Sequence, residues 1–511
     1  MRVAALDLGS NSFHLLVADV HPDRSFTTVT REKEMLRLGD EVAKHGRIRP
    51  AAADRAVACA RRLRELALAN GAIDVEAVAT AAIRAAENGS ELVDRLAAEA
   101  GLHVRVIDGV EEARLVYEAV RASIEIDPGP AVGLDLGGGS LEVWVGHRDQ
   151  LLDATSLHLG VGVLRTLAGD EDPIRTAAIK VIANRVDDDL GPIAEQFDEH
   201  EPTTLIGTSG TFGDLVAMTC DYVGRPVSGR RNHLAITRAE FDDFYADLVR
   251  MTASERRLLP GLEEKRVDLI VPGAVVLHRV FRRFEIDTFT YSDWALREGI
   301  LLDAVGRASP DAFADDNQSV QRASVGALAR RCRSNLEHCA NVLHVAHRLF
   351  DQLEPLHELD KDDRLALEHA VRLHDIGQHV SHERHHEHAA YLVEHGALRG
   401  FDHEQIAFLA AMVRHHRRGE PKPSEPRFAA LSPRERARMR KIVAILRVAD
   451  GLDRGRRQRV HDIDVADDGE VVHLTLHAES DPELEIWGAR RRAALFETVF
   501  RRRLAITVDP H

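Results

Sequence analysis

Two stretches of the chain share one pattern of apolar and polar positions. In residues 131–147 an apolar run ends at an aspartate, a glycine-rich segment with a serine follows, and a second apolar run comes after it. Residues 1–20 repeat the pattern. The aligned residues are Asp7 with Asp135, Gly9 with Gly137 and Ser12 with Ser140. Runs rich in valine and leucine on both sides of a turn predict paired strands, so the repeat predicts a duplicated α/β domain.

The glycine-rich turns are suited to bind an anion. Gly137, Gly138 and Gly139 permit positive φ and a close approach to a ligand, and such a turn can direct several N–H groups at phosphate. Asp135, at the strand end, is well placed to hold a divalent metal, which prefers carboxylate and phosphate oxygens. A purely structural turn is the alternative. A dinucleotide-binding fingerprint is disfavoured, because that motif leads into a helix, whereas residues 142–146 continue as a strand.

Strands and helices are expected to alternate after the first turn. The predicted elements are a strand and loop at 31–38, a helix at 51–70, a strand at 75–80 and a helix from Ser90. Arg84 lies in the crossover between the last two, where its guanidinium would suit phosphate; an ordinary surface arginine is the alternative.

A strand, a turn and a helix are predicted over residues 103–124. Glu111 and Glu112 fall in the first turn of that helix, where acidic residues favour the helix dipole. Alternatively, one of them orients and deprotonates a water molecule. The sequence does not choose between the two glutamates.

The next segments continue the alternation. A strand and turn are predicted at 157–166, a helical region to 196, and a strand, a Gly/Ser/Thr loop and a helix at 203–219. That loop would offer N–H groups at a helix N-terminus, which favours anions. A buried helix at 270–281, a strand and helix at 288–303 and a linker at 307–319 complete this part.

The last third of the chain is predicted to be mostly helical, with a hairpin of residues 471–477 and 484–487 ahead of a helix at 489–504. It holds a series of possible metal ligands: His338, His374, Asp375 and Asp450. Imidazole and carboxylate together suit Mn, Fe, Zn or Mg. A single buried histidine is usually structural, but this combination favours a second divalent metal site. Further residues of interest are His386, His415 and His416.

Composition separates this last third from the rest. The 511 residues carry a net charge of −16, yet from Gln318 onward 31 Lys and Arg balance 30 Asp and Glu, and 19 of the 28 histidines lie there. Its arginine clusters, at 434–441, 454–459 and 501–503, could meet an anionic partner or form solvated helix faces.

Other features bound the class of protein. The four cysteines lack CxxC spacing, so we expect neither a disulfide framework nor a zinc ribbon. No signal peptide or membrane-spanning segment is indicated, which leads us to expect a cytoplasmic protein that binds no membrane.

With these motifs established, the chain resembles the exopolyphosphatase and guanosine pentaphosphate phosphatase (Ppx/GppA) family over nearly its full length. The family motifs appear in order: DLGSNSFHLLV, ATAAIRAAEN, EEARLVYEAV, DLGGGSLE and GTSGT. The resemblance implies an α/β fold with two actin-like (ribonuclease H-like) domains, at 1–124 and 125–306, followed by an α-helical HD-type domain at 318–511.

The resemblance also implies site residues. Glu112 would be the catalytic base, with Glu142 and Arg84 also in catalytic positions, and Asp135 and Asp7 would hold Mg²⁺ or Mn²⁺. The implied phosphate-binding residues are Gly9, Ser10, Asn11, Ser12, Gly137, Gly138, Gly139, Ser140, Gly207, Thr208, Ser209, Gly210 and Thr211. His14 has no role to assign, although it aligns with Glu142 in the repeat.

The expected activity is Mg-dependent release of terminal orthophosphate from inorganic polyphosphate. Guanosine pentaphosphate is the alternative substrate, and no nucleic-acid partner is expected. An actin-like sugar or acetate kinase and a non-catalytic polyphosphate or nucleotide sensor are less favoured. A homodimer is expected because a partner subunit would extend a polyanion track.

Overall fold

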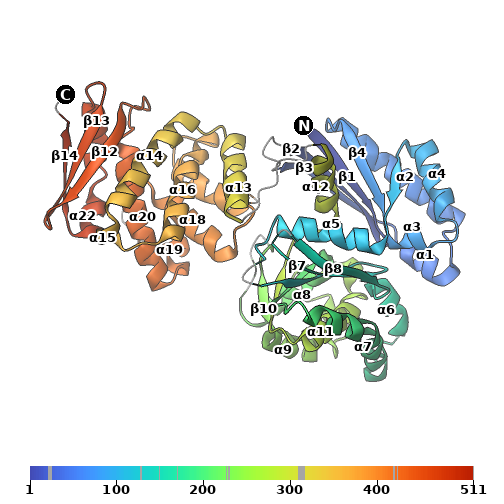
Figure 1. The fold of residues 1–511 in the computed structure, drawn as a ribbon. Helices are drawn as coiled ribbons and strands as arrows, with labels where there is room; N and C mark the ends of the chain where they lie inside the picture. The colour runs from blue at the N-terminus through green and yellow to red at the C-terminus, as the bar shows by residue number, and fades with distance from the viewer. Residues whose placement is uncertain are drawn as a thin grey trace. The chain divides into compact units, whose positions relative to one another are not determined.

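The computed structural model describes residues 1–20, 26–126, 129–148, 150–169, 171–225, 227, 231–308, 317–396, 398–417, 421–422 and 424–509. The chain divides into two compact units, Met1–Val320 and Gln321–His511 (Figure 1). Much of the linker predicted at 307–319 lies outside the described residues. No helix among the described residues is both long enough and apolar enough to span a bilayer.

The first unit contains two mixed sheets. The strands of the first sheet are β1 (Arg2–Leu8), β2 (Ser12–Val20), β3 (Phe26–Met35), β4 (Asp74–Ala79) and β5 (Val104–Val106). They lie in the order β3-β2-β1-β4-β5, with β1 antiparallel to β2 and parallel to β4. Its helices are α1 (Leu38–His45), α2 (Pro50–Ala69), α3 (Ala81–Ala85) and α4 (Gly89–Ala100). Strand β1 is buried along most of its length, which explains its nearly continuous apolar run.

The second sheet repeats the first. Its strands are β6 (Ala131–Leu136), β7 (Leu141–His147), β8 (Gln150–Leu157), β9 (Thr204–Thr208), β10 (Ala235–Thr237) and β11 (Thr288–Tyr291). Read from β8, the order β8-β7-β6-β9-β11 has the same strand directions as β3-β2-β1-β4-β5, and β10 extends it. Its helices are α6 (Val161–Leu167), α7 (Thr176–Asp198), α8 (Ser209–Tyr222), α9 (Arg238–Leu248), α10 (Ala253–Arg256), η1 (Glu264–Arg266) and α11 (Ile270–Phe284).

Two helices join the halves of the first unit. Helix α5 (Gly109–Arg121) follows β5 but packs on β7 and β8, and α12 (Leu296–Ala308) follows β11 but packs on β1 and β2. Figure 1 shows α5 running between the two sheets. Their apolar faces share one buried core that includes Tyr117 and Trp144. Burial of such large aromatic side chains is a major stabilising contribution, so the halves are held in fixed register.

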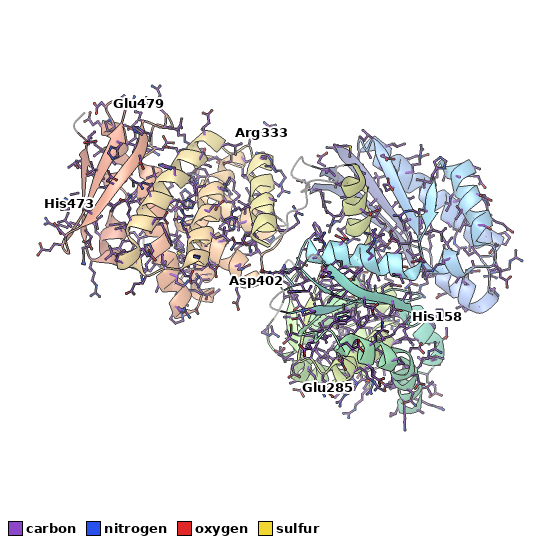
Figure 2. The ribbon with its side chains drawn as sticks, in the orientation of Figure 1. His158, Glu285, Arg333, Asp402, His473 and Glu479 are labelled. Atoms are coloured by element: carbon purple, nitrogen blue, oxygen red, sulfur yellow. The ribbon has the colours of Figure 1, made fainter. Side chains whose placement is uncertain are left out.

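The second unit is helical and ends in a small sheet. Its helices are α13 (Asn317–Arg331), α14 (Leu336–Gln352), α15 (Glu354–His357), α16 (Lys361–Leu373), η2 (Ile376–His379), α17 (His385–His395), α18 (His403–His415), α19 (Pro426–Ala430), α20 (Pro433–Gly451), α21 (Glu483–Arg490) and α22 (Ala494–Phe500). Asp402, labelled in Figure 2, caps α18 in a reciprocal capping box with Gln405. The sheet order is β12 (Val460–Asp467), β13 (Val471–Ala478) and β14 (Arg503–Val508).

The hairpin predicted at the C-terminus is wrong in its second strand. Residues 484–487 lie in helix α21, and β13 pairs instead with β12 and β14. Glu485 is fully buried and accepts a hydrogen bond from Gly455 N, whereas Trp487 is 48% exposed. Four alternating residues are too few to separate a period of 2 from one of 3.6. The helix predicted at 489–504 is likewise interrupted after Arg490 and ends at Phe500.

A second correction concerns residues 157–166. Strand β8 ends at Leu157, and most of the predicted strand and turn forms the start of helix α6. Gly160 stands at the N-cap position of α6, and its role is steric. A Cβ atom there would lie 2.4 Å from backbone atoms of Gly138, so glycine permits close packing of α6 against the glycine-rich bend.

Candidate active site

The two glycine-rich bends face each other across the first unit. A Cβ atom on Gly138 would lie 2.4 Å from Asn11 Cγ, and one on Gly139 would lie 3.0 Å from Ser10 Oγ. Gly137, Gly138 and Gly139 permit positive φ, but none of them adopts it. Their lack of a side chain instead lets the bends approach. Both bends line one cleft of about 470 Å³.

The cleft is lined by acidic residues, among them Asp7 and Asp135 at matched positions of the two sheets. The β1–β2 ladder places Asp7 opposite His14, and the β6–β7 ladder places Asp135 opposite Glu142. Glu112 enters from α5. Glu142 is 1% exposed and accepts a hydrogen bond from Ser156 Oγ at 2.8 Å. The alignment of His14 with Glu142 is thus confirmed by strand register.

Burial and mutual repulsion favour the neutral forms of these acids. Burial, with repulsion by Asp135, raises the pKa of Asp7 to about 7. Burial also raises the pKa of Asp135, and burial together with repulsion by Glu112 and Asp135 raises the pKa of Glu142 well above its usual range. Such a group of acids is a site that a cation would stabilise.

The structure places Glu111 and Glu112 in different environments. Asp108 caps α5 by accepting a hydrogen bond from Glu111 N, and the Glu111 carboxylate pairs with Arg114 and Arg105 away from the cleft. Glu112, in contrast, is 6% exposed and lines the cleft. Burial, opposed by the nearby Arg84, raises the pKa of Glu112 to about 8. Glu112 therefore has the environment of a functional carboxylate, whereas Glu111 has that of a surface ion pair.

Arg84 contacts Glu112, which lines the cleft. Its Nη1 donates to Ile107 O at 2.6 Å and lies 3.2 Å from Glu112 Oε2. The side chain comes from the short helix α3, directly after β4. Arg84 is not among the residues that line the cleft, so in this state it holds Glu112.

The third predicted loop is the first turn of a helix. Helix α8 begins at Ser209, with Thr208 at its N-cap position, and the cleft is lined by Ser209, Gly210 and Thr211. Ser209 has φ of 87°, which is strained for a residue other than glycine. Gly207 lies back in β9, where a Cβ would be 2.0 Å from the Phe289 ring. Gly207 thus makes room for packing, and Thr208 lies opposite Asp135 in the β6–β9 ladder.

Sequence reasoning missed most of the basic residues of the cleft. Lys33, Arg231 and Arg266 line it, as does Arg297, which lies in the strand and helix predicted at 288–303. Arg231 and Arg266 both pair with the buried Asp214, at 2.6 and 2.5 Å. Burial and the neighbouring Arg266 lower the pKa of Lys33 to about 8. Lys33 could have been found only through the pairing of β2 with β3, which places it opposite His14.

His14 connects one of these cations to the first bend. Its Nδ1 lies 3.1 Å from Arg297 Nη1, and its Nε2 lies 2.7 Å from Ser12 Oγ. Burial and Arg297 lower the pKa of His14 well below 6.5, so the ring is neutral. A guanidinium can only donate; Nδ1 therefore accepts, and Nε2–H donates to Ser12. The Ser12 hydroxyl proton is then directed elsewhere, and Ser12 itself lines the cleft.

The histidines and aspartates of the second unit form two adjacent groups. His338, His374 and Asp450 have ligand atoms within 4.8 Å of one another, and so do Asp375, His385 and His416. The sequence analysis grouped Asp375 with His374 and Asp450, but in the structure Asp375 belongs to the second group. Its Oδ2 atom nevertheless lies 3.7 Å from His374 Nε2. His385 was missed, and His386 and His415 lie outside both groups.

The groups of the second unit fit a metal ion. Nε2 of His338 and Nε2 of His374 are buried and have no hydrogen-bond partner among the described residues, while Nδ1 of His374 contacts Val371 O at 2.7 Å. A hydrogen bond at one imidazole nitrogen commonly orients the other toward a metal. Among the described residues, two groups of three ligand atoms lie this close together, and both are in the second unit.

Paired glycine bends, buried acids and basic side chains around one cleft define a phosphate-handling enzyme. The comparisons agree: the chain belongs to the Ppx/GppA phosphatase family, whose family model matches residues 16–308, and the model of Ppx/GppA phosphatase domain III matches residues 320–484. It is therefore a hydrolase of phosphoanhydride bonds, and the kinase and sensor alternatives are not supported.

Several relatives are similar over long segments. Exopolyphosphatase 1 of Mycobacterium leprae is 33% identical over 59% of this chain and 89% of its own length. Guanosine-5′-triphosphate,3′-diphosphate pyrophosphatase of Aeromonas hydrophila is 28% identical over 94% of this chain and 90% of its own length. A solved exopolyphosphatase from Cytophaga hutchinsonii, 30% identical, covers 60% of this chain and 98% of its own with a TM-score of 0.56.

Proposed function

We propose that this protein is an exopolyphosphatase that uses Mg²⁺ to release terminal orthophosphate from linear inorganic polyphosphate. The observation that carries the proposal is the cleft in which the two glycine bends and the N-terminus of α8 meet the buried Glu112. N–H groups at a helix N-terminus and in tight bends suit phosphate. The similarity to Exopolyphosphatase 1 of Mycobacterium leprae supports the same substrate.

Asp7 and Asp135 would hold the metal ion. The donor set fits, because Asp7 Oδ1 is buried with no hydrogen-bond partner among the described residues and the two carboxylates repel each other. Mg²⁺ is commonly bound by one or two carboxylates together with substrate phosphates rather than by a closed protein cage. When bound, it would neutralise charge on the phosphate oxygens.

Glu112 is the general base of the proposed reaction. Its carboxylate takes a proton from water as the water oxygen attacks the terminal phosphorus, and the bond from that phosphorus to the bridging oxygen breaks. The bends at 9–12 and 137–140, with Ser209, Gly210 and Thr211, position the phosphates, and Arg84 and Glu142 complete the arrangement around Glu112. Positioning and electrostatic stabilisation carry most of the catalysis in phosphoryl transfer.

Guanosine pentaphosphate is the second candidate substrate, supported by the similarity to the Aeromonas hydrophila enzyme along nearly the whole chain. Both substrates present a terminal phosphoanhydride to the same residues. Orthophosphate release from long-chain polyphosphate and from guanosine pentaphosphate, measured at equal concentrations of terminal phosphate, tests the proposal. We expect polyphosphate to have the higher kcat/KM, and the reverse order would assign the nucleotide.

We also propose finer descriptions of the two units. The repeated strand order supports two actin-like domains, divided near residue 124, in the first unit, and the histidine–aspartate groups support an HD-type second unit. A homodimer and a cytoplasmic location remain predictions.

The second unit is proposed to bind divalent metal independently of the cleft. His374→Ala should remove one equivalent or more of metal from the purified protein, because His374 Nε2 faces Asp450 Oδ1 at 3.8 Å and Asp375 Oδ2 at 3.7 Å. Elemental analysis measures the metal, and the exposed His473 provides the control variant His473→Ala. Unchanged metal content in His374→Ala would contradict the assignment, and unchanged polyphosphate hydrolysis is expected.

A further inference from the structure

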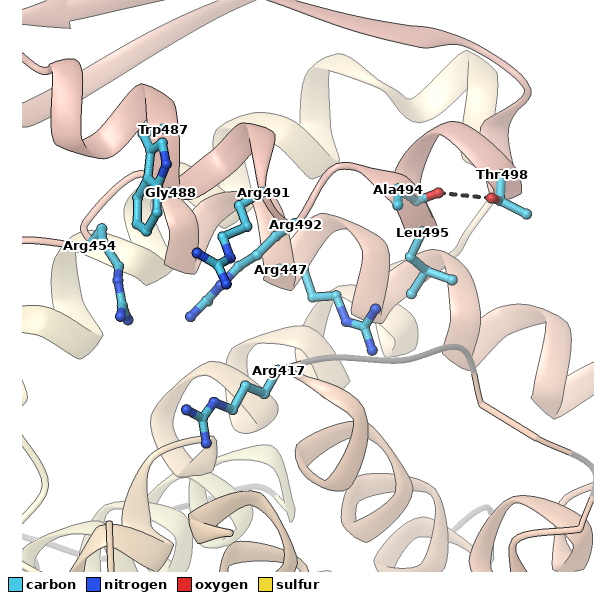
Figure 3. Close-up of a pocket in the computed structure, with 10 residues that line it drawn as sticks. All are labelled: Arg417, Arg447, Arg454, Trp487, Gly488, Arg491, Arg492, Ala494, Leu495 and Thr498. Carbon is cyan, nitrogen blue, oxygen red and sulfur yellow. Dashed lines mark hydrogen bonds between the residues drawn. The ribbon is translucent and has the colours of Figure 1, made fainter. Parts of the chain in front are cut away.

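The second unit contains a pocket lined by arginines. The pocket measures about 480 Å³ and lies among the ends of α18, α20, α21 and α22. Its charged lining residues are Arg417, Arg447, Arg454, Arg491 and Arg492. No carboxylate is among the described residues that line it. Figure 3 shows Arg454, Arg491 and Arg492 pointing toward the side on which Arg417 lies. Five guanidinium groups around one space make a site for a polyanion.

Neighbouring acids do not neutralise all of these arginines. Arg454 and Arg491 are exposed and form no ion pair with a carboxylate of the described residues. Arg447, in contrast, is fixed: it is 5% exposed and donates through Nε and Nη2 to His415 O. The pocket thus combines an anchored wall with two guanidinium groups available to a ligand. Guanidinium binds phosphate through paired, charge-assisted hydrogen bonds.

One wall of the pocket is aromatic. The Trp487 ring is 48% exposed, and the Arg491 guanidinium lies 5.2 Å from its centroid. Figure 3 shows the ring beside Arg454 and Arg491. An exposed indole next to a cation is a stacking surface for a flat heterocycle. A phosphate chain by itself has no use for that surface, whereas a nucleotide base does.

The pocket adjoins the metal-binding group. Arg492 pairs with Asp450, and Asp450 Oδ1 lies 3.5 Å from His338 Nε2. Close packing of α20 and α21 maintains this arrangement, because a Cβ on Gly488 would lie 2.4 Å from Gly451 O. Arg492 is therefore the link between the space lined by arginines and the histidine–aspartate groups.

We propose that this pocket binds a nucleoside polyphosphate, with its phosphates among the arginines and its base against Trp487. The site is separate from the polyphosphate cleft of the first unit. A divalent ion held by His338, His374 and Asp450 would strengthen binding, because it would add positive charge beside the pocket and compete with Arg492 for Asp450.

Trp487 fluorescence in the full-length protein tests the proposal. The other two tryptophans, Trp144 and Trp294, are buried in the first unit, so a signal lost in Trp487→Phe belongs to the pocket. We expect the imido analogue of ATP to change this emission. The double variant Arg454→Ala/Arg491→Ala should weaken binding by at least about tenfold for each arginine removed, the effect of losing a charged hydrogen bond. Added Mn²⁺ should tighten binding in wild type but not in His374→Ala.

Arg457→Ala is the matched control, because Arg457 is an exposed arginine of the same segment that does not line the pocket; it should change affinity less than about twofold. The proposed site would be wrong if the double variant bound the ATP analogue as tightly as wild type, or if the analogue did not change the emission of Trp487. Inorganic triphosphate binding as tightly as the ATP analogue would overturn the nucleoside assignment. The double variant should keep full orthophosphate release from polyphosphate, so failure here is distinct from failure of the proposed function.

Discussion

Glu112→Gln should lower the rate of orthophosphate release by at least about 10²-fold, the lower range for loss of a general base. Glutamine keeps the shape of the side chain and can still contact Arg84, which lies 3.2 Å from the Glu112 carboxylate, but it cannot accept a proton from water. Steady-state release from long-chain polyphosphate measures the effect. Full activity of the variant would exclude Glu112 as the base.

The adjacent residue supplies the control. Glu111→Gln makes the same chemical change one position away, where the carboxylate pairs with Arg105 and Arg114 at the surface of α5. Its rate should stay within about threefold of wild type, since exposed ion pairs contribute little. If both variants lost activity equally, the defect would lie in the position of α5 and not in proton transfer.

The pH profile gives a second measurement of the same group. As a general base, Glu112 would act only when deprotonated, and burial raises its pKa to about 8, so the rate should fall as the pH falls through this range. Bound Mg²⁺ favours the charged carboxylate and should move this acidic limb to lower pH. Glu112→Gln should lack the limb.

The repeated bends could be predicted from the sequence because their signal is local. An apolar run, an aspartate and a serine five residues later recur at Asp7 and Asp135, and the paired strands follow from that pattern alone. The near-identical strand orders of the two sheets agree with this reading. The histidines and aspartates of the second unit were predicted as possible metal ligands from their residue types, and the structure brings His338, His374 and Asp450 close together.

The basic side of the cleft could not be predicted in this way. Arg266 comes from the short helix η1 and pairs with Asp214, which is 52 residues earlier in the chain. Such contacts depend on tertiary packing. The steric role of Gly138 could not be predicted for a related reason. Only the folded structure shows that Asn11 of the opposing bend occupies the space where a side chain at position 138 would lie.

The two halves differ at one informative position. His14 in β2 and Glu142 in β7 occupy matching places opposite Asp7 and Asp135, yet one is an imidazole bonded to Arg297 and the other a buried carboxylate. The duplicated frame thus places a cation-linked group on one side of the cleft and an acid on the other. This asymmetry suits the proposed reaction, in which one end of a phosphate chain would meet the base.

Asp135→Asn should lower kcat/KM by roughly 10²-fold or more and should raise the Mg²⁺ concentration needed for half-maximal rate. The expected size follows from the several kcal/mol that a metal ion contributes to stabilising charge in the transition state, with about 1.4 kcal/mol for each factor of ten. Rates measured across a magnesium titration check both effects. Asp153→Asn, on β8 and away from the residues that line the cleft, is the matched control.

Thermal unfolding without metal separates this effect from damage to the fold. Burial raises the pKa of Asp135 above its usual value, so its ionised form costs stability at neutral pH. Removing that charge should leave the midpoint of unfolding unchanged or higher, even as the activity falls. A variant that lost activity together with several degrees of stability would indicate a structural role for Asp135, and a variant with an unchanged magnesium requirement would remove it from the metal site.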